Sequence, residues 1–110
     1  GPPSAVFEGW MVPSYLVETY APKVRANEAR AAGRRARAAA EQLSGEGAPI
    51  RYVRTTFLPD DETCFHVFEA ASEEAVGEVC RRAGIGAGRI SPAVESHPLP
   101  QLGIGPRGDV

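Results

Sequence analysis

The sequence predicts an α+β domain of the ferredoxin-like class, with the element order β-α-β-β-α-β. Three observations support this: β-rich runs, two segments with apolar residues at helical spacing, and a length of 110 residues, which suits one domain with one core. In this arrangement both helices lie on one face of a four-stranded antiparallel sheet. A two-fold dimer that stacks the two uncovered faces, forming a dimeric α/β barrel, would bury them.

The first strand and helix are expected before residue 44. Residues 13–20 (PSYLVETY) are β-branched and aromatic, and Pro22 ends the run because proline cannot donate to a strand ladder. Residues 25–43 are rich in alanine and arginine, which predicts an amphipathic helix. Its stripe of small residues is expected at Ala29, Ala32, Gly33, Ala36, Ala39, Ala40 and Leu43.

The remaining elements follow a glycine-rich turn. Residues 50–58 and 63–70 are β-rich and are separated by the polar sequence PDDE, which favours an antiparallel hairpin. Ser72 can cap a second helix, and Gly84 can end it. Residues 89–95 are expected to form the last strand, in which Pro92 predicts a sheet edge or a bulge. The buried stripe of the second helix is expected at Ala75, Val76, Val79, Cys80 and Ala83.

Composition sets the domain limits and the location that we expect. The folded domain is assigned to residues 13–96, residues 1–12 to a cloning scar or a disordered N-terminal extension, and residues 97–110, rich in proline and glycine, to an irregular tail. Apolar runs are too short to span a bilayer, and the first residues do not resemble a secretory signal, so we expect a cytoplasmic protein without a membrane partner. Cys64 and Cys80 are expected to be reduced thiols.

Strand alternation then predicts which side chains line the helix-free face of the sheet. This set mixes aromatic and ionisable groups, and Tyr20, Tyr52 and Phe68 are expected to line a lumen between two stacked sheets. The full set assigned to this face is Leu16, Glu18, Tyr20, Tyr52, Arg54, Thr56, Cys64, His66 and Phe68.

A metal site is one interpretation of this face. Cys64 and His66 are two residues apart on one strand and so share a face, where a thiolate and an imidazole suit nickel or another divalent transition metal. Glu18 of the neighbouring first strand is the third candidate ligand. The alternative is structural, with His66 as a hydrogen-bonded residue and Cys64 as a small packed hydrophobe.

An enzyme is the second functional interpretation. His66 titrates nearest neutrality and would act as the base, and Arg54 would anchor an anionic group of an organic substrate. The sequence contains no complete catalytic constellation, so it does not decide whether there is catalysis. Nucleic acid is not expected as a partner, because the strands lack the glycine-flanked aromatic pattern of RNA-binding sheets.

Three segments carry a resemblance to a known family: YLVETY, RYVRTTFLPDDETCFHVFEA and SEEAVGEVCRRAGIGAGRISPAVE. The most specific parts are DDETCF before the third strand, FEA-x-S at the entry to the second helix, and RAG at its end. Between Pro13 and Glu95 the chain resembles a small actinobacterial domain-of-unknown-function family of ferredoxin-like, dimeric proteins, some of them described as nickel-binding.

The resemblance implies a homodimer that binds a metal ion, with nickel preferred. The alternative that remains is a small dimeric-barrel enzyme of the cyclase, isomerase or cofactor-free oxygenase type, which acts on a small molecule in the lumen.

Overall fold

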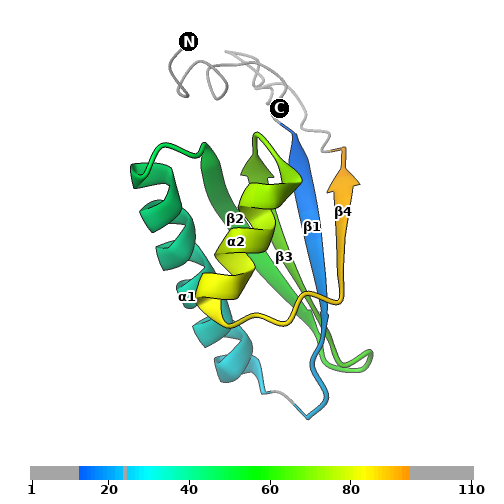
Figure 1. The fold of residues 1–110 in the computed structure, drawn as a ribbon. Coiled ribbons are helices and arrows are strands. Elements are labelled where there is room, and N and C mark those ends of the chain that lie inside the picture. Colours follow the sequence, from blue (N-terminus) through cyan, green and yellow to red (C-terminus); the bar gives the residue numbers. More distant parts are fainter. Residues whose placement is uncertain (1–12, 24, 95–110) are drawn as a thin grey trace, which may run out of the picture.

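The computed structural model describes residues 13–23 and 25–94, and the assignments made for residues 1–12 and 97–110 lie outside these ranges. The element order is β-α-β-β-α-β, as the sequence predicts (Figure 1). The elements are β1 (Ser14–Tyr20), α1 (Ala26–Gly45), β2 (Ile50–Leu58), β3 (Thr63–Ala70), α2 (Glu73–Ala83) and β4 (Arg89–Ala93).

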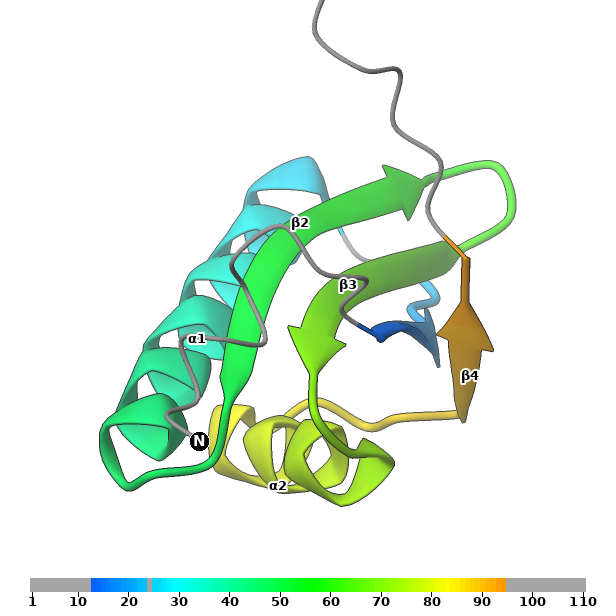
Figure 2. The same ribbon diagram turned by 90° about the horizontal axis from the view of Figure 1, so that it is seen from above.

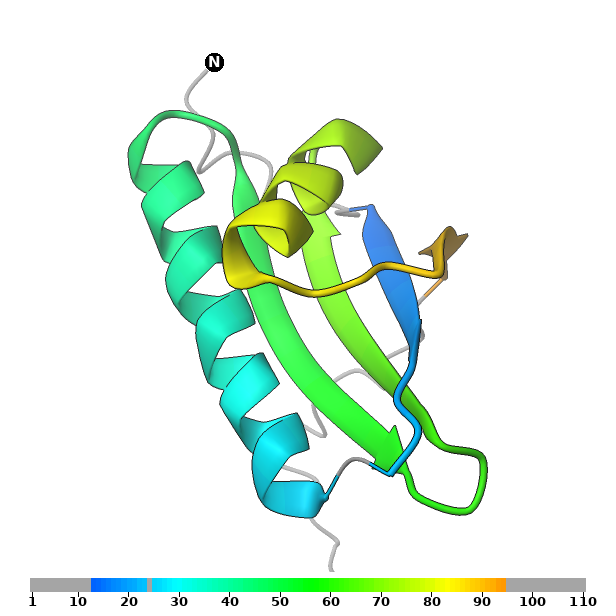
Figure 3. The same cartoon turned by 60° about the horizontal axis from the view of Figure 1, so that its bottom comes forward.

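The strands form one sheet in the order β2-β3-β1-β4, and every pairing is antiparallel. Strands β3 and β1 are therefore central, and β4, which contains Pro92, is an edge strand as predicted. Viewed from above, both helices lie on one face of this sheet (Figure 2). In a third view α1 runs along β2 at the sheet's edge (Figure 3).

The core lies between the helices and this face of the sheet. Val17, Phe68, Val76 and Val79 are each 0% exposed, and they join β1, β3 and α2 in one cluster. The ring of Tyr52 meets Phe68 edge to face, with 5.8 Å between the ring centroids. Within the described part of the chain, neither helix has the length and apolarity that crossing a bilayer requires.

Helix α1 packs through its small residues. Ala29, Gly33, Ala36, Ala39, Ala40 and Leu43 are buried, whereas Ala32, which we also expected, is only partly buried. The closest approach is at Gly33, where a Cβ atom would lie 2.7 Å from the hydroxyl of Tyr52 and 2.9 Å from that of Thr55. A glycine at this position therefore lets the helix rest directly on two hydroxyl groups of β2.

Helix α2 is delimited by two residues that the sequence identifies, Ser72 and Gly84. The Ser72 hydroxyl accepts a hydrogen bond from the Ala75 amide at 3.2 Å, which satisfies a free donor of the first turn. Gly84 ends the helix with a φ of 69°, in the left-handed region that glycine adopts without strain. All five expected stripe residues of this helix are buried.

Ser72→Ala is expected to lower the free energy of unfolding by about 1 kcal/mol, because the Ala75 amide loses its acceptor. Urea unfolding monitored by circular dichroism measures this change. Ser44→Ala, an exposed position near the end of α1, is the matched control and should change stability by less than about 0.5 kcal/mol. Equal losses in both variants would contradict the capping role of Ser72.

A β-bulge interrupts β2 at Val53. Tyr52 pairs with Phe68 and Arg54 pairs with Val67, so Val53 has no partner in β3. The extra residue reverses the alternation of the strand from that point. As a result, Tyr52 and Thr55 both face the helices although they are three residues apart.

Candidate functional site

The candidate site is centred on His66, which lies on the helix-covered face of β3. In the sheet register His66 faces Val17 of β1 on one side and Thr55 of β2 on the other. The residue is only 1% exposed. A buried imidazole needs hydrogen-bond partners, and the neighbouring strand β2 supplies one.

A chain of hydrogen bonds runs from His66 across β2. Nδ1 of His66 and Oγ1 of Thr55 are 2.7 Å apart, and Oγ1 of Thr55 is 2.7 Å from the Tyr52 hydroxyl. The bulge at Val53 makes this chain possible, because it turns Tyr52 and Thr55 to the same side. With Nδ1 engaged, Nε2 is the ring nitrogen left for a ligand.

The surroundings of His66 keep the imidazole neutral. Burial, with a smaller contribution from the positive charge of Arg35, lowers the pKa of His66 to about 4. Arg35 is itself held in place, because its Nε donates to the carbonyl of Ala83 at 2.8 Å and links α1 to the end of α2. A neutral imidazole at physiological pH can act as a metal ligand or as a proton acceptor.

His66 and Cys64 line a cleft of about 420 Å³ bounded by the end of β1, helix α1 and the loop after α2. Cys64 is 3% exposed, and burial raises the pKa of its thiol, so the thiol stays protonated without a metal. Oγ1 of Thr19, also in this wall, is buried and has no hydrogen-bond partner within the described ranges of the chain. Glu28 adds a carboxylate to the same wall, and its Oε1 accepts from the Arg25 amide at 2.8 Å.

The prediction that Cys64, His66 and Phe68 line the helix-free face is wrong. All three pack toward the helices: Phe68 in the main core, Cys64 in a smaller cluster with Ala29, and His66 between them. Strand β3 is central and carries apolar residues on both faces, so the alternation by itself did not reveal which side meets the helices. Tyr52 is also on the helix side, because of the bulge.

This correction separates residues that the sequence had grouped. Glu18 pairs in register with Phe65, and Arg54 pairs with Val67, so both belong to the face opposite His66. The structure thus brings Cys64 and His66 together as predicted but places Glu18 across the sheet from them. Because His66 and Arg54 lie on opposite faces of the sheet, they cannot act together as the base and the anion anchor of one site.

Three other residues lie beside the site or contact its residues: Tyr20, Thr55 and Gly33. Tyr20 is 69% exposed at the end of β1, where its hydroxyl donates to Glu62 at 3.3 Å and its side chain borders the cleft. Thr55 was not predicted as a site residue, and Gly33 was predicted only as a member of the small-residue stripe, although a glycine within an alanine stripe signals a close approach. Among the described residues, no three His, Cys, Asp or Glu side chains lie close enough together to hold a metal ion.

Comparison with known proteins identifies the family. The model of a family described as "Nickel responsive protein SCO4226-like" matches residues 15–92. The chain belongs to the SCO4226-like family. That match spans the sheet, both helices and the cleft around His66. No curated protein matches the sequence.

A solved member of the SCO4226-like group supports the fold. The crystal structure of SCO4226 from Streptomyces coelicolor A3(2) superposes with a TM-score of 0.65 at 19% sequence identity, over 76% of this chain and 99% of that one. At this level of identity the likeness shows the shared ferredoxin-like fold. The resemblance to a small actinobacterial family with nickel-related members is thereby confirmed.

Proposed function

We propose that this chain is a cytoplasmic nickel-binding protein and that His66 and Cys64 of the cleft are its metal ligands. The observation that carries the proposal is membership in a family described as nickel responsive. The cleft supports it chemically, because an imidazole and a thiol suit Ni²⁺, and the imidazole is already neutral.

The ligand set differs from the one expected from sequence, since Glu18 lies on the other face. Glu28 lines the same cleft, but among the described residues no third His, Cys, Asp or Glu side chain lies close enough to join His66 and Cys64, so water would complete the coordination sphere. Binding would release the Cys64 proton, since the metal takes up the thiolate. The affinity should therefore rise with pH more through Cys64 than through His66, whose pKa is already low.

Nickel titration of protein purified without a histidine tag tests the proposal. Isothermal calorimetry is expected to give a dissociation constant below about 100 μM, a value at the weak end of the affinities of dedicated metal sites. His66→Ala should weaken binding by about tenfold or more, and Cys64→Ser should also weaken it. Glu18→Gln is the matched control on the opposite face and should leave the affinity unchanged.

Two results would contradict this assignment. Absence of nickel binding below about 100 μM would remove the function. Normal binding by His66→Ala together with loss in Glu18→Gln would keep the function but move the site to the helix-free face.

We further propose that the protein is a homodimer that joins through the helix-free faces of two sheets. On this face, Leu16 and Phe65 are partly buried, and Leu58, at the end of β2, is 38% exposed. Stacking two copies would remove this apolar surface from water.

Light scattering at micromolar concentration is expected to give twice the mass of one chain, and Phe65→Glu, which places a charge in the stacked face, should give one chain mass. A wild-type monomer would overturn the dimer and leave the nickel proposal standing.

A further inference from the structure

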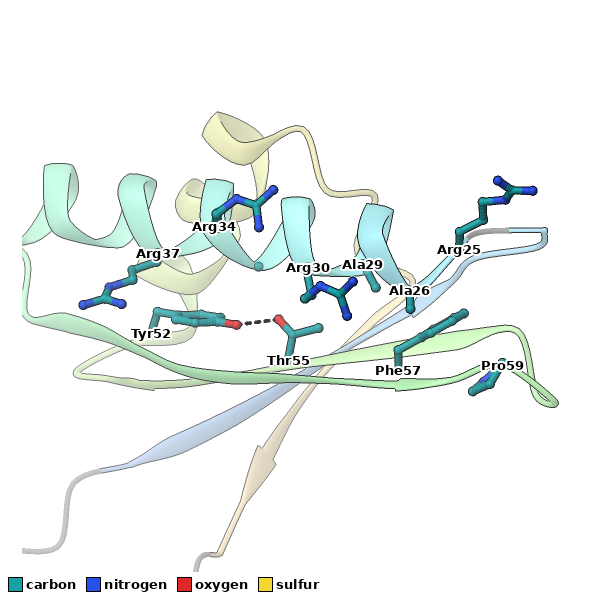
Figure 4. Close-up of a pocket in the computed structure, with 11 residues that line it drawn as sticks. Arg25, Ala26, Ala29, Arg30, Arg34, Arg37, Tyr52, Thr55, Phe57 and Pro59 are labelled. Atoms are coloured by element: carbon teal, nitrogen blue, oxygen red, sulfur yellow. Dashed lines mark hydrogen bonds between the residues drawn. The ribbon is translucent and has the colours of Figure 1, made fainter.

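A second cavity lies outside the cleft around His66. It is a groove of about 790 Å³ between α1 and the edge strand β2 (Figure 4). Tyr52, Thr55 and Phe57 of β2 form its floor. On the helix side Ala29 and Gly33 line it, and at Gly33 the helix lies directly on the hydroxyls of Tyr52 and Thr55, so the groove follows this contact rather than passing beneath the helix.

Arginines line this groove on the side of α1. Arg25, Arg30, Arg34 and Arg37 line it from the start of α1 onward, and none of its described lining residues is Asp or Glu. Arg37 has an ion pair with Glu41 at 3.3 Å. Figure 4 shows the side chains of Arg30 and Arg34 extending from the helix beside the groove.

Arg30 and Arg34 have no counter-charge among the residues that the structure describes. Within residues 13–23 and 25–94, neither the Arg30 nor the Arg34 side chain has an ion pair or a hydrogen bond. They are four residues apart on a helix, a spacing at which like charges repel and destabilise the helix. A bound anion would relieve that repulsion and occupy the free guanidinium donors.

We propose that this groove binds a small organic anion with a flat, apolar body. Arg30 and Arg34 would hold the carboxylate or phosphate group, because a guanidinium presents paired donors that match such groups. The rings of Tyr52 and Phe57 would contact the apolar body. The volume lies in the range of about 300–1,000 Å³ that small-molecule sites occupy.

The site is distinct from the proposed nickel site. The two cavities share Ala29 as a lining residue, and His66 and Cys64 line only the cleft. Loss of nickel binding in His66→Ala would therefore leave this proposal intact. A nucleic acid is a weaker match for the groove, since its apolar floor lies beside one helix and is no extended basic surface.

Phenyl phosphate is a suitable probe because it combines a dianion with one ring. Calorimetry or NMR titration is expected to show saturable binding at least about tenfold tighter than that of inorganic phosphate, which lacks the ring. Benzyl alcohol, which lacks the charge, should bind at least about tenfold more weakly than the probe. The NMR shifts should map to Tyr52, Thr55 and Phe57.

A charge-matched pair of variants tests the role of the arginines. Arg30→Gln with Arg34→Gln should weaken phenyl phosphate binding by about tenfold or more. Arg81→Gln with Arg89→Gln removes the same charge at exposed positions outside the groove, and it should change the affinity by less than about twofold. Circular dichroism checks that both double variants are folded.

Three outcomes would overturn the proposal. One is undetectable phenyl phosphate binding up to about 10 mM. The second is an equal loss in both double variants, which would mean that only net charge matters. The third is binding of a single-stranded oligonucleotide with none of phenyl phosphate, which would make the arginines a nucleic-acid surface.

Discussion

Acidification from about pH 7.5 to about pH 5 is expected to lower the free energy of unfolding by about 2 kcal/mol through His66 alone. In the folded protein the pKa of His66 is lowered to about 4, whereas an unfolded chain gives histidine a pKa near 6.5. Between these values the unfolded chain binds more protons than the folded one. Stability is therefore complete above about pH 6.5 and is lost as the pH falls toward about 4.

Urea unfolding at a series of pH values measures this dependence. His66→Asn is the reference variant, because asparagine keeps a polar atom where Nδ1 meets Thr55 but does not titrate. The variant should be less stable throughout, since truncation leaves a cavity, but its stability should fall less between about pH 6.5 and about pH 5. Parallel profiles for the two proteins would show that His66 is not buried in the neutral form.

Gly33→Ala is expected to destabilise the protein by about 2 kcal/mol. The added methyl group would lie 2.7 Å from the Tyr52 hydroxyl and 2.9 Å from the Thr55 hydroxyl, closer than van der Waals contact allows. Overpacking of this kind costs about 3 kcal/mol, and the better helix propensity of alanine returns about 1 kcal/mol. Thermal or urea unfolding of the variant measures the net change.

Gly77→Ala is the matched control in the other helix. There a Cβ atom would come no closer than 3.7 Å, to the side chain of Arg81, so the substitution should stabilise the protein by about 0.5–1 kcal/mol. Combining Gly33→Ala with Tyr52→Phe should cost less than the sum of the two single changes, because the closest clashing oxygen is gone. Stabilisation by Gly33→Ala itself would show that α1 does not rest on these hydroxyls.

The sequence predicted the elements well because each has local signals at its ends. Ser72 and Gly84 delimit α2, PDDE separates β2 from β3, and Pro92 marks β4 as an edge strand. These signals act through backbone hydrogen bonds and φ angles within a few residues, so they are visible without the tertiary structure.

The candidate site was harder to predict because it depends on which face of β3 meets the helices. Alternation shows that Cys64 and His66 share a face, and the structure keeps them together. Alternation cannot show which of the two faces meets the helices, because Phe65 and Val67 are as apolar as the residues that alternate with them. The hydrogen-bond partners of His66 could not be predicted from the sequence for a second reason. A bulge at Val53 shifts the strand register between Tyr52 and Arg54.

The interruptions in the two outer strands affect how copies of this protein can meet. An outer strand with a regular row of free amide and carbonyl groups invites pairing with a neighbouring chain and can lead to aggregation. Here β2 is distorted by the bulge at Val53, and β4 lacks an amide hydrogen at Pro92. Growth of the sheet from molecule to molecule is thus opposed at both outer strands, which agrees with the proposed association through the helix-free faces of two sheets.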